Sequence, residues 1–151
     1  MKYIIALVLF LSLVAQIMAL ADFANKAEAP NSKELDWMLQ GGNDNLFLVN
    51  FYMPGDNHGD VKTQLQTKIA SNSKYNKLIT YIEVNAARTY QYKDVLEAIG
   101  IYTKPARMYP FVLLVKKGEG YLFRGANIGQ LASDKIAHVL GGHVDYSSTR
   151  Q

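Results

Sequence analysis

The sequence predicts an α/β domain in which helices cover both faces of a mixed sheet. Two observations carry this prediction. Over residues 31–142, apolar runs too short to be helices alternate with segments of helical period, and parallel strands need such helical crossovers. The last two apolar runs are separated only by a short glycine-containing turn, which adds an antiparallel hairpin. The composition is globular, with 49% hydrophobic and 19% charged residues.

The chain begins with an uncharged apolar segment at residues 3–21, between Lys2 and Asp22. Its Ala19-Leu20-Ala21 ending is typical of a signal peptide, so cleavage before Asp22 is one interpretation. As a helix the segment would span about 28 Å, against about 30 Å for the apolar core of a bilayer. The other interpretation is that the segment is retained as a membrane anchor, and we take this as the main hypothesis.

The position of Lys2 predicts that the rest of an anchored chain crosses to the side opposite synthesis. Such a chain would reside in the mitochondrial inner membrane or the endoplasmic reticulum. A cleaved chain would instead be luminal or secreted.

Residues 22–30 are predicted to be a connector, since they are rich in Ala and charge and have little to bury. A short helix follows, with Asn31 as its cap and Glu34 three residues later, as in a capping box. It should end at Gly41-Gly42. Residues 46–52 form a continuous apolar run bounded by turn residues, which is typical of a central strand buried on both faces.

A turn-rich loop is expected over residues 53–60, followed by a helix whose apolar residues at 61–69 are spaced by four. This helix should end near the polar cluster at residues 71–73. A second strand is predicted at residues 78–84. The next helix, around residues 95–99, is closed by Gly100 in the usual C-terminal position.

Pro110 opens the third strand, at residues 111–115, and a turn of Lys, Gly and Glu leads into a strand at residues 121–124. The last amphipathic helix, over residues 131–140, precedes a polar tail at residues 143–151.

The stretches Val49-Asn50-Phe51-Tyr52 and Ile82-Glu83-Val84-Asn85, together with residues 98–101 and 110–118, resemble the thioredoxin family. The resemblance extends from about residue 32 to residue 140. It implies a thioredoxin-like fold for the domain at residues 31–142.

In that family the first of these strands leads into a Cys-x-x-Cys loop, and a cis-proline packs against the dithiol. The resemblance places Asp56-Asn57-His58-Gly59 at the loop and Pro110 at the cis-proline, so a cis Tyr109-Pro110 bond is expected. The family's buried acid falls at Asn50, which cannot titrate. The chain contains no cysteine at all, so thiol–disulfide exchange has neither an attacking nor a resolving thiolate.

We therefore predict a redox-inactive, non-enzymatic module that needs no cofactor. The main hypothesis is a membrane-anchored accessory subunit of a larger membrane complex, with the other subunits as its partners. The alternative is a cleaved, luminal or secreted, chaperone-like relative of protein disulfide isomerases. The resemblance implies that the docking groove consists of Asp56, Asn57, His58 and Gly59 with Tyr109 and Pro110.

Other function classes find little support in the sequence. Asp56, His58 and Asp60 alternate and could offer ligands to a divalent metal, but Asp, Asn, Gly and Pro are also what a turn uses for its own backbone, so we predict no metal site. No Gly-x-Ser-x-Gly nucleophile elbow is present. A net charge of +3 is too small to indicate nucleic acid as a partner.

Four basic residues near the third strand support two interpretations. They could form a surface for acidic partners or lipid headgroups. The preferred interpretation is a solvated edge that blocks pairing with other sheets. The four residues are Lys104, Arg107, Lys116 and Lys117.

Overall fold

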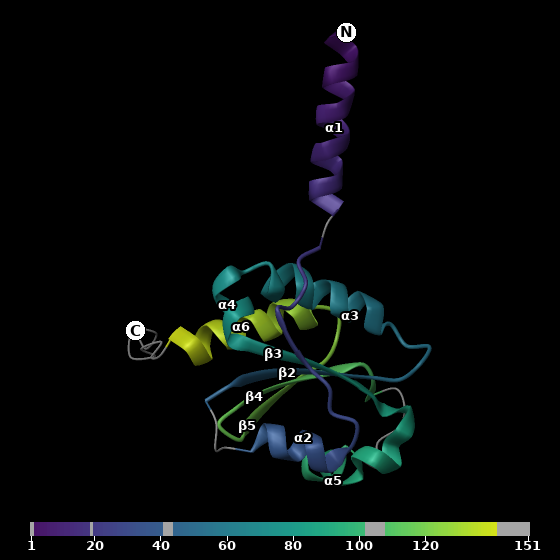
Figure 1. Ribbon diagram of the computed structural model, residues 1–151. Helices are drawn as coiled ribbons and strands as arrows, with labels where there is room; N and C mark the ends of the chain where they lie inside the picture. Colours follow the sequence, from purple (N-terminus) through teal and green to yellow (C-terminus); the bar gives the residue numbers. More distant parts are fainter. Residues whose placement is uncertain (1, 19, 41–43, 102–107, 142–151) are drawn as a thin grey trace, which may run out of the picture.

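The computed structural model describes residues 2–18, 20–40, 44–101 and 108–141. A five-stranded sheet lies between a layer formed by α3, α4 and α6 and a layer formed by α2 and α5 (Figure 1). The helices are α1 (Lys2–Met18), α2 (Ser32–Leu39), α3 (His58–Leu65), α4 (Ser73–Leu78), α5 (Lys93–Ala98) and α6 (Ile128–Gly141), with a π-helical turn at Gln66–Ala70 and a 3-10 segment at Ala86–Tyr92. The strands are β1 (Asn25–Ala27), β2 (Leu46–Tyr52), β3 (Ile79–Asn85), β4 (Phe111–Lys116) and β5 (Glu119–Phe123).

The sheet is mixed, and its strand order is β1-β3-β2-β4-β5. The strands β1, β3 and β2 run parallel, whereas β4 is antiparallel to β2 and β5 is antiparallel to β4. The predicted α/β class, the central position of β2 and the terminal hairpin are therefore confirmed. Gly100 also closes α5 in the left-handed conformation, with a φ of 76°.

Side chains alternate across the sheet and build one core on each face. Leu48 and Leu114 point to the α3 and α6 side, whereas Val49 and Leu113 point to the α2 and α5 side. Each core joins residues from all along the folded domain. The first core includes Phe23, Leu65 and Ile136, and the second includes Leu35, Ile82 and Phe111.

The prediction of a connector at residues 22–30 is wrong for most of that segment. Strand β1 pairs in parallel with the edge of β3, and the side chain of Phe23 is only 3% exposed. The Phe23 ring stacks on Tyr81 with a centroid distance of 4.3 Å, and the Tyr92 hydroxyl donates to the Ala29 carbonyl at 2.8 Å. A strand of three residues is too short to leave an alternating pattern, so no local signal indicated it.

Two further boundaries differ from the predictions. The expected loop over residues 53–60 ends early, because α3 already begins at His58. The cluster at residues 71–73 ends one helix and also begins another, since the Asn72 side chain accepts hydrogen bonds from the backbone of Lys74 and Tyr75 and thereby caps α4.

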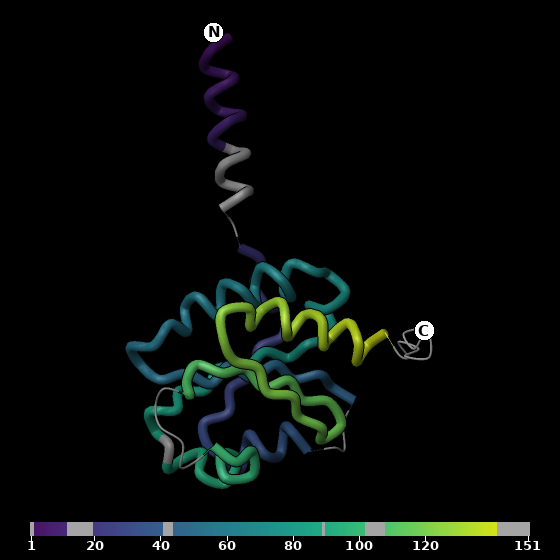
Figure 2. Tube along the Cα trace, turned by 180° about the vertical axis from the view of Figure 1, so that it is seen from behind, coloured from purple at the N-terminus to yellow at the C-terminus, as the bar shows by residue number. Residues whose placement is uncertain are grey.

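Helix α1 projects away from the domain in both views (Figures 1 and 2). The large apolar side chains of residues 3–11 are between 57% and 90% exposed. No helix within the described ranges combines the length and the apolar character needed to cross a bilayer. The expected helix end at residues 41–42, the basic residues Lys104 and Arg107, and the tail at residues 143–151 all lie outside the described residues.

Candidate functional site

The loop between β2 and α3 uses the side chain of Asp56 for its own backbone. Asp56 Oδ2 accepts from the Met53 N–H at 2.8 Å, and Oδ1 accepts from the His58 N–H at 2.9 Å. The Asp56 N–H donates in turn to the Met53 carbonyl at 3.2 Å. A carboxylate at this point satisfies the His58 N–H at the start of α3 and lies at the favourable end of the helix dipole. Asp56, which the resemblance places at the family's first cysteine, therefore holds the loop in place.

His58 is fixed by two neighbours. Its Nδ1 lies 2.6 Å from Asp56 Oδ1, and its ring stacks on Tyr52 with a centroid distance of 4.3 Å. Asp60 lies one residue past Gly59 in the first turn of α3. In the part of the chain that the structure describes, no three His, Cys, Asp or Glu side chains gather where they could hold a metal ion.

The second half of the site is the start of β4. The Tyr109-Pro110 peptide bond is cis, the conformation that the resemblance implies. The Tyr109 ring packs on Phe111 at 5.2 Å between centroids, and Phe111 stacks on Phe51 of β2 at 4.6 Å. Burial raises the pKa of the Tyr109 hydroxyl, so this side chain stays neutral at physiological pH.

A groove of about 360 Å³, which we call the cis-proline groove, joins these two halves. It brings together Asn57, Tyr109 and Pro110, whereas Asp56, His58 and Gly59 are not part of its lining. The complete lining is Asn57, Val61, Gln64, Tyr109, Pro110, Arg124, Gly125 and Ala126.

The sequence did not indicate that Gln64 and Arg124 line this groove. The Gln64 amide is already committed, since it donates to the Ala126 carbonyl and accepts from the Gly129 N–H, both at 3.0 Å. Arg124 Nε donates to the Met108 carbonyl at 2.9 Å. Both residues reach the groove through contacts between distant parts of the chain, so no local sequence signal could have identified them.

The resemblance places the family's buried acid at Asn50 of β2, whose side chain is 1% exposed. Its Nδ2 donates to the Tyr81 hydroxyl at 3.3 Å, and this hydroxyl donates to Glu83 Oε1 at 2.9 Å. Lys62 Nζ lies 3.0 Å from the same Glu83 oxygen. Burial, with a contribution from the Glu83 charge, raises the pKa of Tyr81. This chain of groups therefore includes two neutral members, Asn50 and Tyr81.

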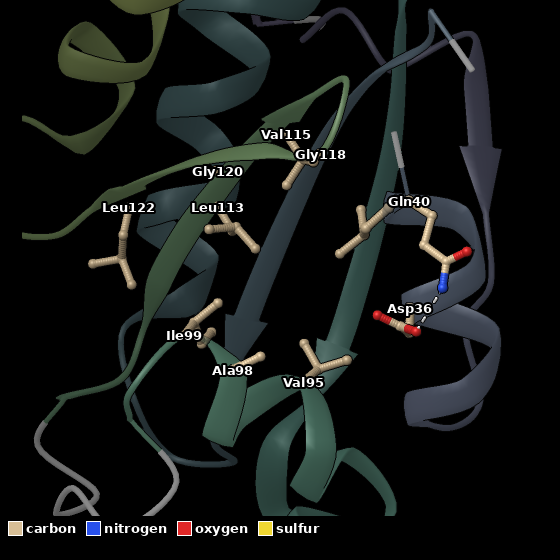
Figure 3. A pocket seen from close by; sticks show the side chains of 11 residues that line it. Asp36, Gln40, Val95, Ala98, Ile99, Leu113, Val115, Gly118, Gly120 and Leu122 are labelled. Carbon is tan, nitrogen blue, oxygen red and sulfur yellow. Dashed lines mark hydrogen bonds between the residues drawn. The ribbon is translucent and has the colours of Figure 1, made fainter. Parts of the chain in front are cut away.

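The structure also contains a larger groove that the sequence did not indicate. It has a volume of about 610 Å³ and lies between α2, α5 and the β4–β5 hairpin (Figure 3). We call it the hairpin groove. Its walls are mostly apolar, with Asp36 of α2 and its C-cap residue Gln40 as a polar rim joined by a hydrogen bond of 3.0 Å. The lining consists of Asp36, Leu39, Gln40, Val95, Ala98, Ile99, Leu113, Val115, Gly118, Gly120 and Leu122.

Comparison with known proteins supports the fold. No protein-family model and no curated protein matches the sequence. Among solved structures, thioredoxin from Trypanosoma brucei brucei matches with a TM-score of 0.58 and 10% identity, covering 81% of this chain and 96% of that one. A mutant thioredoxin from Halobacterium salinarum NRC-1 matches with a TM-score of 0.53 and 17% identity, covering 79% and 94%.

The J-Trx1 fragment of ERdj5 matches with a TM-score of 0.54 and 17% identity, covering 78% of this chain. The present chain spans about half of that fragment, since 52% of it is covered. These likenesses establish a thioredoxin-like fold. Because the 151 residues contain no cysteine, this is a thioredoxin-like fold without the Cys-x-x-Cys motif.

Proposed function

We propose that this chain is a redox-inactive thioredoxin-like binding module that recognises a protein partner through the cis-proline groove. One observation carries the proposal. The groove beside Asn57, Tyr109 and Pro110 is present although the chain has no cysteine with which to perform redox chemistry. Recognition of a partner gives the groove a use that does not depend on thiols.

The lining of the groove is suited to an extended polypeptide. Asn57 is exposed, and its side chain makes no capping hydrogen bond with α3. The Tyr109 ring and Pro110 offer a flat apolar surface beside it, and Arg124 adds positive charge. An extended segment with backbone carbonyls or an acidic side chain near an aromatic or apolar residue fits this combination.

We further propose that the partner belongs to a membrane assembly, in which this chain is an accessory subunit. The exposed apolar side chains of residues 3–11 support this, because a continuous apolar helix surface requires a lipid or protein cover. The assembly would lie in the mitochondrial inner membrane or the endoplasmic reticulum, with the domain on the side opposite synthesis.

One observation favours the alternative function, a luminal or secreted chaperone-like binder that begins at Asp22. Every fully buried residue of the two cores lies at Phe23 or later. Cleavage before Asp22 would therefore keep every buried residue of the two cores, although it would remove Ala21, a partly buried residue packed against the first core. Under this alternative the groove would bind unfolded client chains instead of one permanent partner.

A blocking substitution tests the role of the groove. Asn57→Tyr places a bulky ring in the groove at an exposed position, and Lys33→Tyr on the exposed surface of α2 is the matched control. Each full-length variant is expressed with an affinity tag in the source cells and purified from membranes in mild detergent. We expect Asn57→Tyr to reduce the recovery of co-purifying polypeptides at least about tenfold relative to Lys33→Tyr. Equal recovery with both variants would contradict recognition through this groove.

A further inference from the structure

Strand β5 is an open edge of the sheet. It pairs with β4 on one side and, among the described residues, with no strand on the other. Natural edge strands are commonly protected by Lys, Pro or a bulge, but the sequence of β5 is Glu-Gly-Tyr-Leu-Phe. The nearby Lys117 lies in the turn and pairs with Asp44 at 3.3 Å. The expectation of a protective basic edge therefore does not apply to β5 itself.

The hairpin geometry determines which backbone groups face outward. Lys117 and Gly118 form a two-residue turn with φ values of 51° and 77°, so Lys116 and Glu119 are the hydrogen-bonded pair next to the turn. Hydrogen-bonded and non-hydrogen-bonded pairs alternate along an antiparallel ladder. Gly120 and Leu122 consequently turn their N–H and C=O groups away from β4, toward the open edge.

The same two residues border the hairpin groove. Leu122 is 40% exposed, and Gly120, two positions earlier in β5, lines the same groove without a side chain (Figure 3). A Cβ atom at Gly120 would lie 3.4 Å from Leu113 Cδ1 and 4.0 Å from Val115 Cγ2, which are ordinary contacts. The backbone of Gly120 is also not in the left-handed region. The fold itself does not require glycine here, and glycine inside a strand often marks the close approach of another chain.

We propose that β5 pairs antiparallel with β5 of a second copy of this chain, with Tyr121 at the two-fold axis. In this register Gly120 of each copy lies opposite Leu122 of the other, and their outward backbone groups form the hydrogen-bonded pairs. Each Leu122 side chain then covers the space that Gly120 leaves open beside the groove. A large residue and an absent side chain, placed symmetrically about Tyr121, make the edge self-complementary.

Charge on the opposite face of β5 supports the same register. Lys135 Nζ lies 4.1 Å above the Tyr121 ring, and Tyr121 donates a hydrogen bond to Glu119 of its own strand at 3.2 Å. In the dimer, Glu119 of the second copy becomes a diagonal neighbour of Tyr121, at about 7–8 Å between backbones. An acidic side chain of each copy thus approaches the ammonium group of the other.

Single cysteines test this register directly, because the natural chain has none. Across the axis the two Tyr121 residues form a non-hydrogen-bonded pair, with Cα atoms about 4.5 Å apart, within disulfide range. We expect the full-length Tyr121→Cys variant, in mild detergent at about 100 μM, to give a covalent dimer on oxidation. The high concentration suits an interface at the small end of the usual size range.

Two matched controls separate this register from random collision. Glu119→Cys and Phe123→Cys each place identical cysteines about 14 Å apart, so neither variant should cross-link by itself. A mixture of these two variants should cross-link, because residue 119 of one copy lies opposite residue 123 of the other. Failure of Tyr121→Cys to cross-link, or equal cross-linking of all three variants, would overturn the proposal.

An exchange of the two complementary residues provides a second measurement. Gly120→Leu should weaken dimerisation at least about tenfold because two leucines then compete for one space, and Leu122→Gly should weaken it through lost contact. The double variant Gly120→Leu with Leu122→Gly restores one leucine opposite one glycine, so it should recover dimerisation. Thermal unfolding of each variant is the control that tests whether the fold is intact. A double variant no better than Gly120→Leu would contradict the proposed pairing.

Discussion

Helices cover the two faces of the sheet to different degrees, and the less covered face carries the larger groove. On the α3 and α6 face the helices are in close contact, since a Cβ atom at Gly129 would lie only 2.7 Å from Gln64 Cβ. On the other face, α2 and α5 leave the β4–β5 hairpin partly uncovered, and Leu113 and Val115 border an open groove. At the Gly129–Gln64 contact the first face leaves no room for an added atom, whereas the second face has an open apolar groove.

Truncation of one leucine on each face should give the largest contrast. Leu114→Ala removes a side chain that is 0% exposed in the closed core, so it should lower the free energy of unfolding by about 2–5 kcal/mol. Leu122→Ala removes a side chain that is 40% exposed and should cost less than about 1 kcal/mol. Urea unfolding under dilute conditions, where the chain is monomeric, measures both. Similar losses would show that the two faces do not differ in packing.

Asn50 lies on the α3 and α6 face, where its side chain contacts Tyr81. Asn50→Asp would place an acid where the resemblance to the thioredoxin family expects one. Burial should raise the pKa of the new carboxyl above its unfolded value of about 3.9. The folded form then binds the proton of this carboxyl more tightly than the unfolded form does. The variant therefore has its highest relative stability below about pH 3.9 and loses that stability as the pH rises through the folded pKa.

We expect Asn50→Asp to be about 2–4 kcal/mol less stable at pH 8 than at pH 4, relative to the native chain at the same two pH values. Thermal or urea unfolding across this range measures the difference. A stability difference between the variant and the native chain that does not change with pH would mean that solvent reaches residue 50.

The same change at two glycines sharpens the comparison between the faces. Gly129→Ala adds a methyl group where Gln64 leaves no space, so it should cost about 1–3 kcal/mol despite the better helix propensity of alanine. Gly120→Ala on the open face meets only ordinary contacts and should be neutral or stabilising by up to about 1 kcal/mol. The two variants are compared by their urea midpoints. A loss at Gly120 as large as that at Gly129 would argue against an open groove.

Substitution of Asp56, which lies outside both cores, should change the stability least. Asp56→Ala removes the acceptor for the Met53 and His58 N–H groups and should cost about 1–2 kcal/mol. Asp60→Ala is the control, because Asp60 is exposed and is also in the first turn of α3. Hydrogen exchange should show faster opening of the loop only in Asp56→Ala. Unchanged exchange would show that the carboxylate does not hold the loop.

Much of the fold could be predicted because the central strands carry uninterrupted apolar runs. The runs of β2 and β4 are bounded by turn residues, and Gly118 lies where a two-residue hairpin needs a positive φ. Strand β1 could not be predicted, since its three residues gain their partner only from β3, more than fifty positions later. Its position depends on tertiary packing instead of local propensity.

The candidate site was predictable only in part. The positions of Asn57, Tyr109 and Pro110 could be inferred from the resemblance, and turn chemistry explains why Asp56 bonds to its own loop. Gln64 and Arg124 enter the groove through packing between distant elements. The hairpin groove was equally hidden, because it depends on how far α2 and α5 extend over the sheet.

The central claim is that this chain acts by binding another protein, and the native state of the endogenous protein tests it most directly. The measurement combines the intact mass of the chain with native electrophoresis after mild detergent extraction. The account predicts a full-length chain of 16.9 kDa that migrates with other polypeptides in a larger membrane complex. A shorter chain beginning at Asp22 with bound clients would favour the luminal alternative. A chain of either length that is found alone, with no other polypeptide, would contradict the account.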